Sequence, residues 1–358
     1  MKTLMIMAGG TGGHVYPALA VADDLRARNV EVFWLGTQRG LEARVVPEAG
    51  IDIEWVTIGG IKGKGWLTRL LAPIRIAIAM LQTGAVIFRR RPEAVLGMGG
   101  FVAGPGGLTA WLLRVPLLIH ESNAVAGLTN RWLARIASRV LVGFPDVLAG
   151  RRHRQYVGNP VRADITALPA PAQRLADRSG PLRLLVVGGS LGAQVFNEIV
   201  PQAVAELPAD TAVDVRHQSG RGKLEGTLQN YSKSGAEGDV HEFISDMAVA
   251  YAWADVVVCR AGAMTVAELA AAGVAAILVP YPYAIYDHQT ANARFLADQD
   301  AAILLPQPEF SATRLAALLT ELAHNRERVQ GLSIQARRLA VTDATQKVAA
   351  ACLEVMHA

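Results

Sequence analysis

A chain of 358 residues exceeds what one hydrophobic core usually organises, so its length predicts two domains. An apolar fraction of 51% with 18% charged residues excludes a disordered chain. The net charge of +4 favours anionic partners only weakly, because it is spread over a large surface. Two cysteines without paired spacing, Cys259 and Cys352, exclude a disulfide scaffold and indicate a reducing compartment.

Apolar, β-rich runs alternate with helical patterns from one end of the chain to the other. The expected strands lie at residues 3–8, 31–36, 94–98, 115–120, 139–144, 182–189, 212–218, 255–262 and 274–280. Most of these runs are continuously apolar, which is typical of parallel strands buried on both faces. The pattern predicts an α/β protein built from doubly wound parallel sheets.

The first expected strand passes directly into the glycine-rich stretch "GGTGGH", residues 9–14. A glycine turn between a strand and a helix lets backbone N–H groups approach an anion, and Pro17 suits the first helical turn. The stretch therefore predicts contact with a phosphate or another oxygen-rich group, with a tight structural turn as the alternative. Dinucleotide binding is disfavoured because Val15 stands where that motif needs a small residue. The chain also lacks the Gly-Lys-Ser/Thr sequence of a P-loop.

Residues 62–91 combine basic side chains with an apolar segment and contain no acidic residue. The cations are Lys62, Lys64, Arg69, Arg75, Arg89, Arg90 and Arg91. Pro73 and Gln82 make the apolar segment 70–88 a poor membrane span, but an interfacial helix with flanking cations fits an anionic membrane surface. A buried core helix with a solvated basic end is the alternative.

The second half of the chain repeats the plan of the first. "LLVVGGSLG" at 184–192 matches "MIMAGGTGG" near the start, and the proline-rich stretch 157–173 is the expected joint. We therefore expect two Rossmann-like domains, with ligands bound in a cleft between them at the carboxyl ends of the strands.

A separate anion site is expected in "CRAGAMTVAELAAAG", residues 259–273. Ala263, Met264 and Thr265 would begin a helix and offer free N–H groups to a diphosphate. Glu268 follows one turn later, where a carboxylate can accept two hydrogen bonds from a ribose diol. The alternative is a glutamate that merely complements the helix dipole.

Several long motifs resemble the MurG family of bacterial glycosyltransferases. They are "MAGGTGGHVYPALAVA", "GMGGFVAGPGGLTAW", "HESNAVAGLTNRWLA", "VGNPVR", "VVGGSLGA", "YAWADVVVCRAGAMTVAELAAAG" and "DHQTANA". The resemblance covers nearly the whole chain and implies a GT-B fold. It implies an acceptor- and membrane-binding domain over 1–162, joined by a last helix at about 340–358, and a UDP-sugar-binding domain over 163–339. It also implies inverting transfer of N-acetylglucosamine from UDP-N-acetylglucosamine to the 4-hydroxyl of lipid-linked muramoyl pentapeptide (lipid I), giving lipid II.

The family's binding residues can be carried over position by position. The resemblance implies that Thr11, Gly12, Gly13, Asn123, Arg162, Ser190, Ile244, Ala263, Met264, Thr265, Val266, Ala267, Glu268 and Gln289 contact the donor. It assigns Glu268 to the ribose, Ile244 to the uracil and Gln289 to a sugar hydroxyl. The glycine-dense stretch 97–107 would hold the acceptor diphosphate at Gly100, Gly104 and Gly106. Leu191, Tyr283 and His288 depart from the family pattern.

His14 is the candidate general base, because histidine transfers protons near neutral pH and this one follows the first glycine loop. His120 and Glu121 are the next candidates, and a purely positioning role for His14 is the alternative. The charge of departing UDP could be met by the helix start at 263–265 and Arg162 without a metal. The Asp298-Gln299-Asp300 sequence ends a helical run, so it is interpreted as solvated surface and no cofactor is expected.

The expected partners are UDP-N-acetylglucosamine, lipid I, an anionic membrane surface and proteins of cell-wall synthesis, with no nucleic acid. The expected location is the cytoplasmic face of the bacterial inner membrane. Two other functions stay open: a UDP-N-acetylglucosamine 2-epimerase on the same fold, and a non-catalytic membrane scaffold that binds the UDP sugar.

Overall fold

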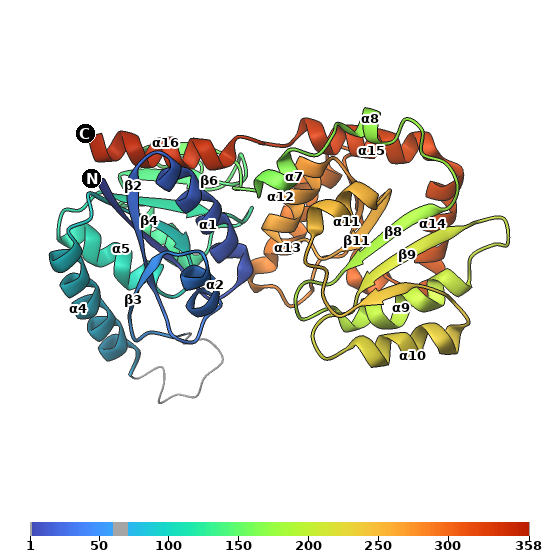
Figure 1. Cartoon of the computed structure of the whole chain (residues 1–358), viewed down its shortest axis with the longest axis horizontal. Coiled ribbons are helices and arrows are strands. Elements are labelled where there is room, and N and C mark those ends of the chain that lie inside the picture. The colour runs from blue at the N-terminus through green and yellow to red at the C-terminus, as the bar shows by residue number, and fades with distance from the viewer. Residues whose placement is uncertain (1, 60–70, 358) are drawn as a thin grey trace. The chain divides into compact units, whose positions relative to one another are not determined.

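The structure is a computed structural model that describes residues 2–59 and 71–357 (Figure 1). The chain divides into two compact units: residues 1–162 with 341–358, and residues 163–340. Each unit contains one parallel sheet with helices packed around it. The predicted doubly wound α/β class is confirmed.

The first unit is built on a seven-stranded sheet. In spatial order its strands are β3 (Asp52–Trp55), β2 (Val30–Gly36), β1 (Lys2–Ala8), β4 (Ala94–Gly99), β5 (Leu117–Glu121), β6 (Arg139–Val142) and β7 (Arg154–Tyr156). Ile6 on β1 lies opposite Trp34 on β2 and Leu96 on β4, and all three are fully buried. The strand order reverses between β1 and β4, so the loops after these two strands meet at a topological switch point.

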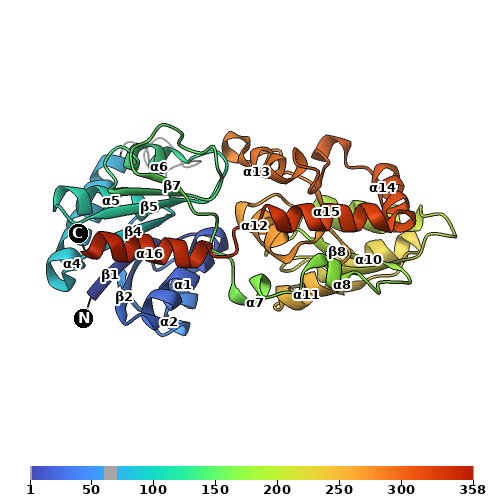
Figure 2. The ribbon, with the colours of Figure 1, turned by 90° about the horizontal axis from the view of Figure 1, so that it is seen from above.

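Six described helices cover this sheet. They are α1 (Gly12–Ala27), α2 (Glu42–Glu48), α4 (Ala72–Arg90), α5 (Ala103–Leu112), α6 (Leu128–Leu133) and α16 (Ala344–His357). The C-terminal α16 lies along α1 in both views (Figures 1 and 2). Val348 and Cys352 of α16 are fully buried in the same core as Leu4 and Ile6, so the end of the chain completes the first unit.

The second unit is built on a six-stranded sheet. In spatial order its strands are β10 (Asp239–His241), β9 (Val213–Gln218), β8 (Leu182–Val187), β11 (Val256–Cys259), β12 (Ala275–Leu278) and β13 (Ile303–Leu304). The helices are α7 (Ala163–Thr166), α8 (Pro171–Arg174), α9 (Gln194–Ala205), α10 (Leu224–Ser234), α11 (Met247–Trp253), α12 (Ala263–Ala272), α13 (His288–Ala297), α14 (Ala312–His324) and α15 (Arg326–Arg338). Short 3₁₀ turns occupy Ile285–Asp287 and Gln307–Glu309. The order 3-2-1-4-5-6 is that of a Rossmann sheet, with its switch point between β8 and β11.

Candidate functional sites

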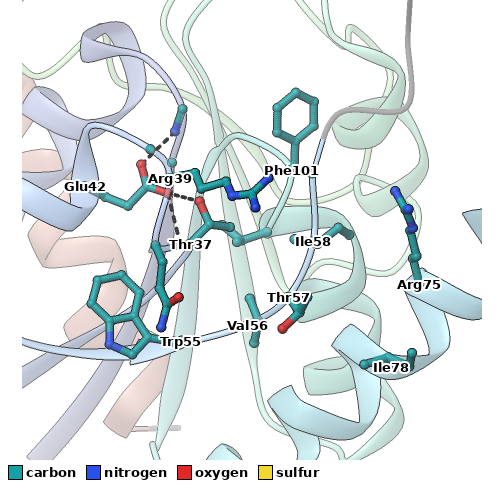
Figure 3. Close-up of a pocket in the computed structure, with 16 residues that line it drawn as sticks. Thr37, Arg39, Glu42, Trp55, Val56, Thr57, Ile58, Arg75, Ile78 and Phe101 are labelled. Atoms are coloured by element: carbon teal, nitrogen blue, oxygen red, sulfur yellow. Dashed lines mark hydrogen bonds between the residues drawn. The ribbon is translucent and has the colours of Figure 1, made fainter. Parts of the chain in front are cut away.

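The first glycine loop is held in place by a buried carboxylate. Glu42, at the start of α2, is fully buried, and its Oε2 accepts a hydrogen bond from the Gly10 N–H at 2.9 Å. Its Oε1 accepts from the N–H of Thr37 at 3.1 Å and from the Thr37 hydroxyl at 2.7 Å. Gly10 has a φ of +92°, a conformation that only glycine adopts without strain. These hydrogen bonds, drawn as dashed lines in Figure 3, therefore hold the loop in one conformation before α1. Gly12 and Gly13 are the first residues of that helix, where N–H groups have no partner within the helix.

The second glycine motif packs directly against the first. Gly100 has a φ of +88°, and a Cβ there would lie 2.4 Å from the Gly9 carbonyl oxygen. Gly104 and Gly106 lie within α5 rather than in the loop. Gly106 is buried, and a Cβ at this position would clash with Met7, whose Sδ would be 2.3 Å away. Gly106 thus serves the core of the first unit, and of these three glycines only Gly100 lies in the loop between β4 and α5.

His14 is the third residue of α1 and lies against Gly99, where a Cβ would come within 2.6 Å of its ring. Its Nδ1 is 3.4 Å from the Gly9 carbonyl oxygen, which favours the tautomer that carries its proton on Nδ1. Burial lowers the pKa of His14, while the Glu121 carboxylate and the Gly9 hydrogen bond partly oppose that shift. The imidazole is therefore neutral near pH 7, with Nε2 as its proton acceptor.

Glu121 organises the loop that follows β5. It is 4% exposed, and it accepts hydrogen bonds from the Asn123 N–H (3.0 Å), the Asn123 side-chain amide (3.2 Å), the Gly127 N–H (3.0 Å) and the Asn130 amide (2.9 Å). These bonds fix the orientation of Asn123 and the start of α6. Glu121 is therefore a structural carboxylate whose charge also faces His14, and the burial leaves it no direct access to a substrate.

His120, the other candidate base, is buried at 1% exposure. Its Nε2 is 2.9 Å from the Gly158 carbonyl oxygen, and burial lowers its pKa. This hydrogen bond joins the end of β5 to the segment after β7. His120 therefore has a structural role, which is to hold these two segments together. Arg162 is half-buried at the end of the first unit.

In the second unit, the "GGSLG" loop packs closely against the loop after β9, and this contact restricts which residues it can contain. A Cβ on Gly192, at φ +66°, would lie 1.8 Å from the Ser219 carbonyl oxygen, and one on Gly188 would lie 2.2 Å from the Ala193 nitrogen. Ser190 and Leu191 are exposed at the tip of this loop. The glycines therefore allow two backbone segments to touch, while the tip presents Ser190 to solvent.

Gln218, at the carboxyl end of β9, connects this loop to the segment that carries Ile244. It is 3% exposed; its Nε2 donates to the Gly189 carbonyl at 3.0 Å, and its Oε1 accepts from the Ile244 N–H at 2.9 Å. The Ile244 N–H is thus engaged within the protein, and its carbonyl oxygen is the group that can accept from a base. Sequence reasoning missed Gln218, although its place at the end of an expected strand was a signal.

Helix α12 begins at Ala263 as expected, with Gly262 as an extended N-cap that offers no side chain to the free N–H groups. Ala263 and Val266 have buried side chains, so any ligand contact there is through the backbone. Glu268 is partly buried, and its Oε2 accepts a hydrogen bond from the Tyr251 hydroxyl at 3.0 Å. Tyr251, on α11, was also missed from the sequence, and it sets the position of the candidate ribose carboxylate.

The opposite end of α12 is anchored by Arg174. Its Nη1 donates to the carbonyls of Tyr251 (3.1 Å) and Ala254 (3.2 Å), and its Nη2 donates to those of Ala272 (3.3 Å) and Gly273. These carbonyls end α11 and α12, where a cation complements the helix dipole. One half-buried guanidinium therefore fixes both helices that carry Tyr251 and Glu268.

Gln289, on α13, accepts a hydrogen bond at Oε1 from the Tyr281 N–H at 2.9 Å, which leaves Nε2 as the donor end of that amide. Tyr283 is exposed and His288 is the first residue of α13. Asp298 and Asp300 are exposed in the turn after α13. Among the described residues, no group of three or more His, Cys, Asp or Glu side chains could hold a metal ion.

Helix α4 carries an exposed apolar stripe made of Ile74, Ile78, Leu81 and Phe88, with Leu81 76% and Phe88 69% exposed. In the described part of the chain it is the one helix long and apolar enough to cross a membrane, and 22% of it is buried. The predicted basic flank is smaller than expected, because Arg89 pairs with Glu54, and Arg90 pairs with Glu31, Asp52 and Glu54. Lys62, Lys64 and Arg69 lie outside the described residues.

Comparison with known proteins agrees with this arrangement. Residues 4–142 match the glycosyltransferase family 28 N-terminal domain, and residues 183–348 match the family 28 C-terminal domain. The chain is 54% identical, over 98% of its length and 97% of the relative's, to UDP-N-acetylglucosamine--N-acetylmuramyl-(pentapeptide) pyrophosphoryl-undecaprenol N-acetylglucosamine transferase of Thiobacillus denitrificans. The enzyme of the same name from Aeromonas hydrophila is also 54% identical, over 98% of this chain and 96% of that one.

Solved structures give the same result. Acinetobacter baumannii MurG matches with a TM-score of 0.85 and 40% identity, over 99% of this chain and 100% of that one. The calicheamicin glycosyltransferase CalG4 matches in fold, with a TM-score of 0.71 at 16% identity.

Two parallel Rossmann-like units with these matches define a glycosyltransferase of the GT-B fold. Within that class, the chain belongs to the MurG family, the UDP-N-acetylglucosamine–N-acetylmuramyl-(pentapeptide) pyrophosphoryl-undecaprenol N-acetylglucosamine transferases. The family resemblance found in the sequence motifs is confirmed.

Proposed function

We propose that this chain transfers N-acetylglucosamine from UDP-N-acetylglucosamine to the 4-hydroxyl of the muramoyl pentapeptide in lipid I, giving lipid II with inversion at the anomeric carbon. The observation that carries the proposal is the donor-type site of the second unit. There a helix start with free N–H groups is followed one turn later by Glu268, which the Tyr251 hydroxyl holds in place. The chain bears this site within a sequence that matches such transferases over almost its full length.

The donor's parts are assigned to separate groups of the second unit. The N–H groups at Ala263–Thr265 bind the diphosphate, where the helix dipole favours negative charge. Glu268 accepts hydrogen bonds from the ribose diol, and the Ile244 carbonyl accepts the N3–H of uracil. Gln289 donates to a sugar hydroxyl through Nε2, and Ser190 contacts the donor near the phosphates.

The chemical step needs a base, a nucleophile and stabilisation of the leaving group. His14 Nε2 takes the proton of the acceptor 4-hydroxyl as that oxygen bonds to the anomeric carbon. The bond from this carbon to the β-phosphate oxygen breaks, and UDP leaves with the electron pair. The α12 N-terminus and Arg162 stabilise the charge on UDP. Thr11, Gly12, Gly13 and Asn123 contact the N-acetylglucosamine of the donor, and Gly100 lies at the acceptor diphosphate.

No step of this mechanism requires a metal ion, so we expect transfer to continue in excess chelator. Loss of activity in EDTA that magnesium restores would contradict this expectation. The measurement is initial rate with and without chelator at saturating donor.

A bilayer surface is the proposed location, at the cytoplasmic face of the bacterial inner membrane, with the exposed stripe of α4 inserted at the interface. Leu81→Glu should reduce sedimentation of the protein with anionic vesicles, because it places a charge in the apolar stripe. Gln155→Glu, at an exposed position on β7 of the first unit, is the control for added charge alone.

The decisive assay supplies radiolabelled UDP-N-acetylglucosamine with and without a lipid I analogue. Label transferred to the lipid supports the proposal. An epimerised UDP sugar would instead support a 2-epimerase, and donor binding without either product would support a scaffold.

A further inference from the structure

The second unit contains a buried chain of hydrogen bonds that no step above uses. It begins on α10, crosses to α9, which packs beside α10 (Figure 1), and ends at the loop after β9. Its members are Tyr231 on α10, His217 on β9, Asn197 on α9 and the Ser219 carbonyl. All four residues are at most 3% exposed. Polar groups buried this deeply cost stability unless each one has a partner.

The geometry gives every link of this chain one direction. The Ser219 carbonyl can only accept, so Asn197 Nδ2 donates to it at 3.0 Å and Asn197 Oδ1 faces His217. His217 Nε2, 3.1 Å from that oxygen, therefore carries the ring proton. Burial lowers the pKa of His217 to about 4, so the ring holds a single proton at pH 7. Its Nδ1 then accepts from the Tyr231 hydroxyl at 3.0 Å.

The chain ends on the backbone that supports the "GGSLG" loop. The Ser219 carbonyl oxygen lies so close to Gly192 that a Cβ there would be only 1.8 Å away. Two residues further along, the Arg221 N–H donates to the Ser190 carbonyl at 3.3 Å. The loop after β9 thus contacts the "GGSLG" loop at both Ser190 and Gly192, so a displacement of Ser219 would displace Ser190.

His217 and its neighbour Gln218 act on different parts of the second unit. They are consecutive on β9, so their side chains point to opposite faces of the sheet. Gln218 bonds to the Ile244 N–H, whereas His217 bonds to groups on α9 and α10. A change at His217 therefore leaves the Ile244 segment attached to Gln218.

We propose that Tyr231 and His217 are positioning residues for the diphosphate of the donor. Through Asn197 they hold the Ser219 carbonyl, and through the loop after β9 they set the position of the Ser190 hydroxyl at the phosphates. The assignment rests on the proposed function, in which Ser190 contacts the donor near its phosphates. It extends the donor site to two buried side chains that act through other residues.

The binding test measures the Kd for UDP, inorganic pyrophosphate and uridine by calorimetry on the full chain. Tyr231→Phe removes only the hydroxyl, and it should weaken UDP and pyrophosphate by the same factor, roughly two- to tenfold, the range for one net hydrogen bond. His217→Phe removes two links and should weaken both ligands more. His217→Gln keeps a donor and an acceptor and should lie between wild type and His217→Phe. Uridine affinity should stay unchanged, because Gln218 still holds the segment at Ile244.

Thr227→Val is the matched control for lost stability in the same helix. Thr227 lies on α10 and is 1% exposed, and its hydroxyl donates to the Lys223 carbonyl at 2.8 Å, outside the chain. This variant should lower the urea midpoint and leave all three Kd values unchanged. A merely structural role of Tyr231 would give Tyr231→Phe the same result. Urea unfolding of every variant checks that the fold is retained.

A double-mutant cycle tests whether the effect passes through Ser190. Ser190→Ala alone should weaken pyrophosphate, and adding Tyr231→Phe to it should weaken pyrophosphate no further, because the positioned hydroxyl is already gone. In the transfer assay, Tyr231→Phe should raise the KM for UDP-N-acetylglucosamine by the factor seen in the Kd. The KM for a lipid I analogue should stay at the wild-type value.

The assignment is overturned if Tyr231→Phe and both His217 variants keep the wild-type Kd for pyrophosphate. It is also overturned if Tyr231→Phe weakens pyrophosphate equally with and without the Ser190 hydroxyl. A wild-type protein that shows the expected binding pattern but transfers no sugar to a lipid I analogue would support the assignment and refute the proposed function. Transfer with unchanged pyrophosphate binding in all variants would do the reverse, so the two failures are distinguishable.

Discussion

Gln218 should control the affinity for the uracil end of the donor without touching the diphosphate site. Its buried amide joins the Gly189 carbonyl to the Ile244 N–H, so it ties the "GGSLG" loop to the segment proposed to bind the base. Gln218→Met keeps the length of the side chain and removes both hydrogen bonds. The matched control is Gln194→Met, which removes an exposed amide on α9 that bonds only to Glu198 in the described chain.

The size of the effect follows from the groups left behind. Each lost hydrogen bond is worth about 0.5–1.5 kcal/mol net, so the two hydrogen bonds of the buried Gln218 amide contribute about 1–3 kcal/mol. Part of this loss appears as lower stability of the second unit. The rest of the loss is the free energy needed to order the segment at Ile244 again when UDP binds. If this ordering costs about 1.4 kcal/mol, the Kd for UDP rises roughly tenfold.

Calorimetric titration with UDP and with inorganic pyrophosphate measures this share directly. We expect a weaker UDP affinity in Gln218→Met, with pyrophosphate affinity unchanged, because α12 is anchored separately by Arg174. If urea unfolding shows the stability loss while the Kd for UDP stays at the wild-type value, Gln218 does not position the base-binding segment and the reasoning is wrong.

Three further predictions concern other buried groups. His14→Gln should lower kcat by roughly 10²–10⁴-fold with little change in donor Kd, and it should abolish the acidic limb of the kcat/KM profile; burial lowers the His14 pKa, so that limb lies below pH 6.5 in the wild type. Tyr251→Phe should raise the KM for UDP-N-acetylglucosamine several-fold, because the hydroxyl that orients Glu268 is lost; an equal loss of affinity for pyrophosphate would argue against this reason. Burial lowers the pKa of His217 to about 4 in the folded protein. As the pH falls below about 6.5, the unfolded state therefore binds a proton that the folded state does not bind. The free energy of unfolding of the second unit should then fall by about 3 kcal/mol between pH 7 and pH 4. Urea unfolding of wild type and His217→Gln tests this, and identical pH slopes would contradict it.

Continuous apolar runs were sufficient to locate the inner strands of both sheets, because strands buried on both faces leave that signature in the local sequence. The edge strands β3, β7 and β10 were missed. They are short, they include exposed polar residues such as Asp52 and Asp239, and only pairing with a neighbouring strand makes them extended.

The sequence also located the start of α12 and the glycine loops after β1 and β8, since a helix start and a glycine cluster are local features. It could not assign each glycine a purpose. Gly106 is a packing position against Met7, and Gly192 is required by the Ser219 carbonyl, which comes from a different loop.

The sequence by itself determined the doubly wound architecture and the family. The architecture follows from local periodicity, and the family follows from long contiguous motifs. Only the tertiary structure decided which side chains act together. Gln218 and Ile244 are 26 residues apart in the chain, and Arg90 meets acidic residues from β2 and β3 rather than a solvent-facing patch. Such pairings depend on which strand ends and loops the folded sheet brings side by side, and no local pattern records that.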